Sequence, residues 1–260
     1  MPAANQLVLG ADLGGQPVGQ LLRLANRHGL VAGATGTGKT VTLQRLVEEF
    51  SDAGVAVFAA DVKGDLCGLG AVGAPQGKVA ERIASMPWLE HRPTAYPVTL
   101  WDIHGQSGHP LRTTLSEMGP LLLGALLELT DSQQAALYAA FKVADREGLL
   151  LLDLKDLKAL LAHLKNHPEV LGEDSALFTN TSSQALLRKL AGLEQQGADA
   201  LFGEPALQLE DILHPDRDGR GRIHLLDASR LVHEAPKVYA TFLLWLLAEL
   251  FEQLPERGDA

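Results

Sequence analysis

The spacing of apolar residues divides the chain into strand-like and helix-like stretches. Short continuous apolar runs at 28–33 and 55–61 are typical of buried, central strands in a parallel sheet. From 111 to about 203, apolar residues recur at three- and four-residue spacing, which predicts a series of amphipathic helices. Strand texture returns at 222–229, and a long, mostly apolar helix, suited to burial against a sheet, follows over 236–254. The pattern predicts an α/β protein whose parallel-sheet core carries a large all-helical insertion.

The predicted elements near the N-terminus form a strand–loop–helix–strand unit. A small hairpin is expected over 5–19, and the first helix over 39–54. A second helix is predicted over 79–89, and a further strand over 95–105 ends near Asp102.

Three segments follow from this order of elements. Residues 1–104 form the first part of the core, 111–205 the helical insertion and 222–260 the return to the core. Within the insertion, Thr130 and Asp153 stand where side chains cap helix N-termini.

Composition and charge narrow the class of protein. With 260 residues, 46% hydrophobic and 21% charged, the sequence is typical of a soluble globular protein with a substantial core. Its net charge of −10 argues against a broadly basic surface that coats nucleic acid, but leaves room for a narrow basic channel. A lone cysteine, the lack of a signal peptide and apolar runs too short to span a bilayer predict a cytoplasmic protein without membrane contact.

A glycine-rich loop lies between the first predicted strand and helix. Gly33, four residues, Gly38, Lys39 and Thr40 fit the phosphate-binding pattern G-x-x-x-x-G-K-[ST]. Glycines allow the tight turns that point backbone N–H groups into one concavity, and the helix N-terminus adds its dipole. An ordinary glycine-rich turn is the alternative, but the position between strand and helix favours a nucleotide loop. The loop comprises Gly33, Ala34, Thr35, Gly36, Thr37, Gly38, Lys39 and Thr40.

This loop predicts ATP and Mg²⁺ as cofactors. Lys39 would reach the β- and γ-phosphates. The Thr40 hydroxyl would ligate Mg²⁺.

Acidic residues at the ends of predicted strands are further candidates for this site. Asp61 ends one strand and is followed by Lys63 and Asp65, and the carboxyl ends of parallel strands face the ligand crevice. For these three residues, a polar exit from strand to loop explains the pattern equally well. Asp102 and Asp227 end two other apolar strands, and either could hold Mg²⁺ through water.

An Asp-Glu pair is absent from the sequence. Many ATP-driven machines carry four apolar residues followed by Asp-Glu, in which the Asp serves the metal and the Glu activates the attacking water. No catalytic residue is therefore assigned. Either the base is supplied differently, or the segment that carries it lies outside this sequence.

Other potential sites have simpler explanations. His163 and His167 share one helix face, but without an adjacent Glu they are best explained as exposed helix-end residues. Residues 216–221 begin like a calcium loop and lack its later ligands, which favours a hairpin turn. Cys67 lies near the expected nucleotide crevice without a specific His partner, which favours a structural role. Three tryptophans could stack on bases, although core packing is the better explanation: Trp88, Trp101 and Trp245.

Four segments together resemble the bacterial HerA-like ATPases of the HerA/FtsK superfamily. The first is common to many phosphate-loop proteins, and the third, in the helical insertion, is specific to the family. The resemblance extends over about residues 7–254. The segments are RHGLVAGATGTGKTVTLQ (27–44), AADVKGDLCGL (59–69), LTDSQQAALYAAFKVADREGLLLLDLKDLKALL (129–161) and GRIHLLDASRLV (221–232).

The resemblance implies a RecA-like core, hexameric rings and ATP-driven movement along double-stranded DNA, sometimes coupled to a nuclease. By the same resemblance, Gly33, Gly38, Lys39 and Thr40 have the nucleotide role, and Asp61 lies near the site. In such proteins the Asp-Glu strand, a sensor strand and an arginine from a neighbouring subunit follow the long helix. We therefore expect this chain to be the N-terminal half of a longer protein, with ATPase activity belonging to the complete one.

Two other functions stay open beside a HerA-like translocase. A P-loop phosphotransferase, such as a small kinase, would need lid arginines, and the insertion offers few of them. A non-catalytic, nucleotide-switched scaffold is favoured by the missing Glu if the chain is complete. The arginines of the insertion considered for a lid are Arg112, Arg146 and Arg188.

Overall fold

The computed structural model of the protein describes residues 6–12, 14–87 and 92–254. Trp88, considered above for base stacking, and the end of the helix predicted over 79–89 lie outside the described residues. Residues 1–5 of the predicted segment 1–104 and residues 255–260 of the predicted segment 222–260 also lie outside the described residues.

The described chain folds into two compact units. The first, here called the sheet unit, contains the chain up to Trp101 and Leu209–Asp227. The second, the helical unit, contains Asp102–Gln208 and Ala228–Leu254. The contacts therefore divide the segment 222–260, which we had assigned to the core as one piece, between the two units.

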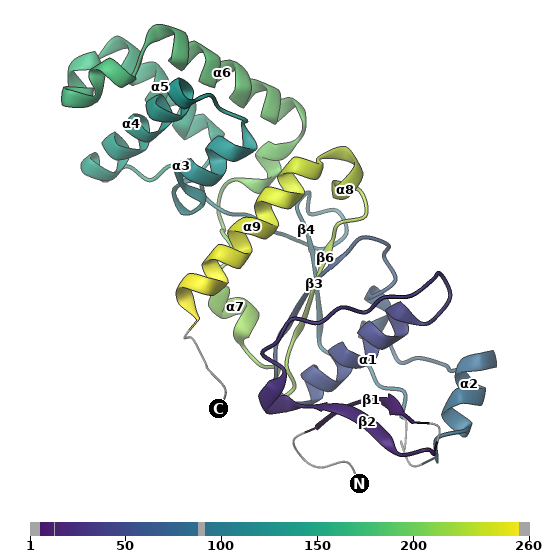
Figure 1. The fold of residues 1–260 in the computed structure, drawn as a ribbon. Helices are drawn as coiled ribbons and strands as arrows, with labels where there is room; N and C mark the ends of the chain where they lie inside the picture. Colours follow the sequence, from purple (N-terminus) through teal and green to yellow (C-terminus); the bar gives the residue numbers. More distant parts are fainter. Residues whose placement is uncertain (1–5, 13, 88–91, 255–260) are drawn as a thin grey trace. The chain divides into compact units, whose positions relative to one another are not determined.

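The described strands include a four-stranded sheet with the order β3-β6-β4-β5 (Figure 1). The strand β6 (Ile223–Asp227) lies between β3 (Val57–Asp61) and β4 (Val98–Asp102) and is parallel to both. A short strand, β5 (His109–Pro110), ends the order. The predicted α/β class with a parallel sheet is confirmed.

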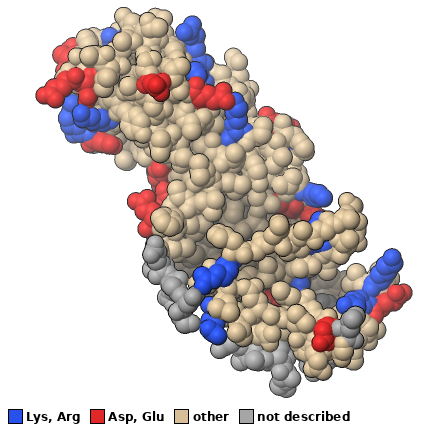
Figure 2. Space-filling model, viewed as in Figure 1, with Lys and Arg blue, Asp and Glu red and all other residues tan. Residues whose placement is uncertain are grey.

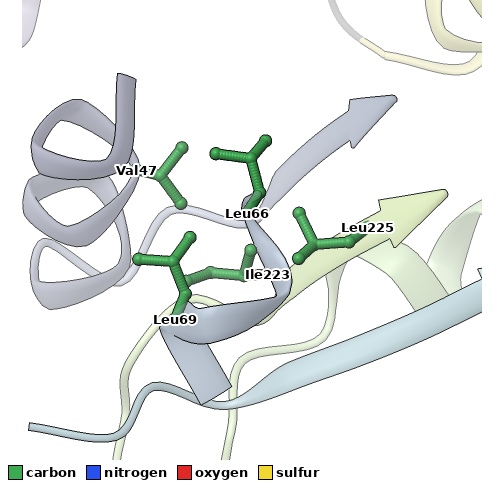
Figure 3. Close-up of a cluster of buried hydrophobic side chains, with 5 residues drawn as sticks. All are labelled: Val47, Leu66, Leu69, Ile223 and Leu225. Carbon is green, nitrogen blue, oxygen red and sulfur yellow. The ribbon is translucent and has the colours of Figure 1, made fainter. Parts of the chain in front are cut away.

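Helix α1 (Lys39–Asp52) packs on one face of this sheet through a cluster of apolar side chains. Figure 3 shows Val47 from α1 facing Leu66 and Leu69, which follow β3, with Ile223 and Leu225 of β6 beneath them. All five side chains are buried, and each contributes about 1.5–3 kcal/mol relative to an exposed position. The cluster fixes α1 and the connection after β3 to the same strand.

Two strand predictions in this unit are wrong. Residues 28–33 form no strand, and Leu30 is 90% exposed. The physical reason is that a strand needs a lateral partner for its backbone N–H and C=O groups, and no described strand pairs with this segment. For the same reason β3 is the edge strand of the described sheet rather than a central one.

The N-terminal hairpin is held to α1 by polar contacts. Strands β1 (Gln6–Ala11) and β2 (Pro17–Leu21) pair antiparallel. The Val8 N–H donates to Glu49 (2.7 Å), and Arg45 donates to the Val8 carbonyl (3.2 Å). The remaining elements of the sheet unit are η1 (Leu22–Leu24), η2 (Cys67–Gly70), α2 (Gly77–Ala84) and α7 (Leu209–Leu213).

Helices occur in the helical unit over the stretch 111–203, where they were predicted. Side-chain caps mark the starts of several of them. Thr114 accepts from the Glu117 N–H at the start of α3, and Asp153 accepts from the Lys155 and Asp156 N–H groups at the start of α5. Thr130 precedes α4, and its own N–H is bound by the Gln133 side chain. The elements are α3 (Leu115–Leu126), α4 (Asp131–Glu147), α5 (Leu154–Asn166), η4 (Pro168–Leu177), α6 (Asn180–Gln195), η5 (Ala198–Leu201), α8 (Leu231–Glu234) and α9 (Pro236–Gln253).

The long helix α9 packs on α3 and α8 within the helical unit. At the end of α3, Lys237 of α9 forms an ion pair with Glu128. Lys189 of α6 donates to the Leu127 and Glu128 carbonyls (2.8 and 2.6 Å), so it satisfies carbonyl groups left open at the helix C-terminus.

A buried histidine lies in the middle of the sheet. His224 of β6 is 1% exposed, and its Nδ1 accepts a hydrogen bond from Trp101 Nε1 of β4 (3.0 Å). Burial lowers the pKa of His224 to about 4 and outweighs the backbone of Ile212, which favours the protonated form. The folded sheet therefore holds this imidazole neutral.

We expect this histidine to make stability depend on pH between 6.5 and about 4. Above pH 6.5 the imidazole is neutral in both states, whereas below it the unfolded chain takes up a proton that the folded chain does not. As pH falls, the wild type should lose up to about 1.4 kcal/mol of unfolding free energy per pH unit relative to His224→Gln. Urea unfolding of both proteins across this range measures the difference, and parallel curves would contradict the prediction.

Candidate nucleotide site

The phosphate loop has the backbone conformation that its glycines predict. Gly36 and Gly38 have φ of 81° and 95°, in the left-handed region that favours glycine. A Cβ on Gly33 would lie 2.6 Å from the Thr37 hydroxyl, so a larger residue there would displace the Thr37 side chain. Helix α1 begins at Lys39, directly after Gly38, and its first N–H groups open onto the loop.

Donors inside the loop converge on one carbonyl. Lys39 Nζ donates to the Ala34 oxygen (2.7 Å), and the Thr37 hydroxyl donates to the same oxygen (2.8 Å). The Lys39 ammonium therefore lies over the loop. A lysine that contacts a phosphate held by this loop needs that position. Thr35 completes the exposed turn between these groups.

The first turn of α1 is connected to the segment after β3. The Thr40 hydroxyl donates to Asp65 Oδ2 (3.1 Å), and Gln44, one turn further along α1, donates to the Asp65 carbonyl (3.0 Å). Of the acidic residues predicted for the site, Asp65 is the one whose carboxylate is bound to the loop's Thr. Gln44 was missed by the sequence analysis, although its position four residues after Thr40 on the same helix face was a usable signal.

Asp61 has a different set of partners. Its carboxylate accepts three backbone N–H groups of the turn that follows β3, from Lys63 (3.1 Å), Gly64 (2.8 Å) and Leu66 (2.8 Å). The residue is 6% exposed. This arrangement shapes the turn, and the nucleotide role of Asp61 stays a prediction.

Asp102 repeats this arrangement at the end of β4. It accepts from the N–H groups of His104 (3.0 Å), Gln106 (2.7 Å) and Ser107 (3.0 Å). Burial raises the pKa of Asp102, but these three donors outweigh it and leave the pKa below its usual value. Asp227 ends β6 in register with Asp61.

The residues of the loop fit a bound phosphate and a hard cation. A Cβ on Gly33 would crowd the cradle, and the donors are backbone N–H groups and one ammonium, the set that phosphate requires. A hydroxyl and a carboxylate beside them, from Thr40 and Asp65, are the oxygen donors that Mg²⁺ prefers.

The lesser candidates do not assemble a second site. His163 and His167 lie side by side, with ring centroids 4.6 Å apart, and His167 contacts Glu169. Nowhere among the described residues do three potential metal ligands of the His, Cys, Asp and Glu types come together. Cys67 is exposed, with its Sγ 3.3 Å from the Gly64 carbonyl oxygen. Residues 216–221 form a turn closed by the Asp216 N–H and the Arg220 carbonyl (2.8 Å).

The two described tryptophans are engaged in packing. Trp101 contacts His224 within the sheet unit, and Trp245 is 3% exposed on α9.

The charged side chains show no broad basic surface on the visible face. In Figure 2, blue Lys and Arg side chains and red Asp and Glu side chains are interspersed. Across the described ranges, no helix combines the length and the hydropathy needed to cross a membrane.

The parallel sheet and the Gly33–Thr40 loop at the start of α1 are features of a P-loop nucleotide-binding fold. The chain belongs to the family described as helicase HerA-like C-terminal, whose family model matches residues 6–260. The resemblance to HerA-like proteins is thus confirmed.

A comparison with solved structures finds a protein of similar fold. The chain is similar to VirB4 of Thermoanaerobacter pseudethanolicus, with a TM-score of 0.50 over 99% of this chain and 67% of that one. The two sequences are 17% identical, so the likeness concerns the fold alone. No curated protein was found to match the sequence.

We expect Asp61→Ala to loosen the turn after β3. Three backbone N–H groups lose a charged acceptor, which should lower the free energy of unfolding by at least about 2 kcal/mol. Hydrogen exchange at Lys63, Gly64 and Leu66 should accelerate relative to Asp199→Ala, a control at an exposed carboxylate. Unchanged exchange at those amides would show that Asp61 does not shape the turn.

Proposed function

We propose that this protein binds ATP with Mg²⁺ at Gly33–Thr40 and that the bound nucleotide drives a HerA-like DNA translocase. The observation that carries the proposal is the loop itself, with glycines in left-handed backbone, Lys39 over the turn and Thr40 at the start of α1. Membership of the HerA-like family supports the same conclusion.

The roles of the loop residues follow from their chemistry. The backbone N–H groups of the loop and of the first turn of α1 hold phosphate oxygens, and Lys39 neutralises charge on the β- and γ-phosphates. The Thr40 hydroxyl offers an oxygen to the metal. When bound, Mg²⁺–ATP supplies the phosphoanhydride whose hydrolysis releases free energy.

The water-activating base is not assigned to a residue of this sequence, because no Asp-Glu pair occurs in it. We propose that the working ATPase is a hexameric ring that acts on double-stranded DNA, with a nuclease as a possible further partner. The acidic net charge of −10 implies that any DNA contact is confined to a narrow basic path rather than a broad surface.

Of the two alternatives, the nucleotide-switched scaffold has the stronger support. The missing Asp-Glu pair favours it if the complete protein also lacks that pair, since such a scaffold needs binding without turnover. The phosphotransferase is disfavoured because two of its three lid arginines are engaged: Arg112 donates to the Glu204 carbonyl (2.8 Å) and Arg146 to that of Val170 (2.7 Å).

We expect Lys39→Ala to abolish ATP binding while the fold is retained. The Lys39 ammonium donates to the Ala34 carbonyl within the loop itself, so its removal should leave the core intact. Fluorescence titration with a labelled ATP measures affinity, and circular dichroism with thermal unfolding checks the fold. An ATP affinity equal to that of the wild type would contradict the assignment of the site. The control is Lys78→Ala, at an exposed lysine of α2.

We expect steady-state ATP turnover in the assembled protein to rise when duplex DNA is added. Electron microscopy of the same sample should show rings. ATP binding without turnover, with or without DNA, would instead support the scaffold.

A further inference from the structure

We infer that Asp65 is the carboxylate that serves the metal position of the phosphate loop, by holding and orienting the Thr40 hydroxyl. The inference deepens the proposed function and rests on it, because it concerns the Mg²⁺ that accompanies ATP. It assigns a positioning role to one of several acidic residues that the sequence leaves equivalent.

The contact that carries the inference is the hydrogen bond from the Thr40 hydroxyl to Asp65 Oδ2 (3.1 Å). A Thr hydroxyl has one hydrogen and two lone pairs. When the hydrogen is donated to Asp65, the lone pairs are directed away from that carboxylate and are free to face a cation. The carboxylate also adds negative charge beside the metal position, which favours a divalent cation there.

Asp65 is held in this place by its neighbours on both sides. Its own carbonyl accepts from Gln44 Nε2 (3.0 Å), which ties the main chain to α1. The next side chain, Leu66, is buried against Val47 of α1 in the apolar cluster (Figure 3). The preceding Gly64 has φ of 73°, a conformation that lets the chain turn sharply before Asp65.

The carboxylates that end β3 and β4 already accept hydrogen bonds from their own turns. Asp61 and Asp102 each accept three backbone N–H groups of the turns that follow their strands. A carboxylate held by three backbone donors cannot turn toward a metal without opening its own turn. Asp65 has its contact with Thr40 instead, and its side chain is exposed toward the loop.

The test measures how much Mg²⁺ strengthens ATP binding, with the chain of 260 residues and a fluorescently labelled ATP. Affinity is compared in EDTA and across a Mg²⁺ titration for the wild type, Asp65→Asn, Thr40→Val and the double variant. Asp65→Asn should need roughly ten-fold more Mg²⁺ for the same enhancement, the usual effect of removing a partner that orients a metal ligand. Its affinity in EDTA should equal that of the wild type.

Thr40→Val should have the same defect, and the double variant should be no worse than Thr40→Val alone, since Asp65 acts through that hydroxyl. Asp52→Asn, at the far end of α1, is the matched control and should leave the Mg²⁺ dependence unchanged. Thermal unfolding of each variant separates a lost metal partner from a lost fold.

Each outcome decides one question. An unaltered Mg²⁺ dependence in Asp65→Asn overturns the inference, and so does a double variant whose defects add. If Lys39→Ala meanwhile abolishes ATP binding, the proposed function stands without it. If Lys39→Ala binds ATP like the wild type, the proposed function itself fails, whatever Asp65 does.

Discussion

The placement of β6 between β3 and β4 is the constraint on which the candidate site depends. This strand comes from a part of the sequence far beyond the phosphate loop, yet it brings Ile223 and Leu225 under α1. The apolar cluster built on them holds Val47 and Leu66 together. Through Leu66 it also sets the position of the turn after β3 relative to the first turn of α1. The polar contacts of the site are thus arranged by apolar packing behind them.

Carboxylates at the strand ends have separate tasks in this fold. A buried Asp that accepts three backbone N–H groups is held by charge-assisted hydrogen bonds, and it keeps a sharp turn in one conformation. Asp61 and Asp102 use this device on strands that both flank β6. Four residues after Asp61, on the turn that it stabilises, Asp65 is left to face the loop. Asp61, which fixes the turn, and Asp65, which we propose to serve the metal position, are therefore different residues.

Much of this was predictable from residue spacing, and the misses have a common cause. The loop Gly33–Thr40, the helix after it and the helical insertion follow from local chemistry: glycine turns, caps at Thr130 and Asp153, and three- to four-residue periodicity. The strand at 28–33 and the central position of β3 were wrong, because an apolar run indicates burial but not which strand lies beside it. The choice among Asp61, Asp65 and Asp102 also depended on contacts between distant segments.

The helical segment that separates β4 from β6 in the sequence affects the order in which parts of the chain can fold. Helices α3–α6 contact one another within one stretch of the sequence, whereas β6 must pair with β3 across that whole stretch. Contacts of such wide separation form late because closing the intervening loop costs entropy before any pairing is gained. During synthesis, therefore, helices α3–α6 can form while the phosphate loop still lacks the strand that supports it. Nucleotide affinity would be among the last properties that the newly made chain acquires.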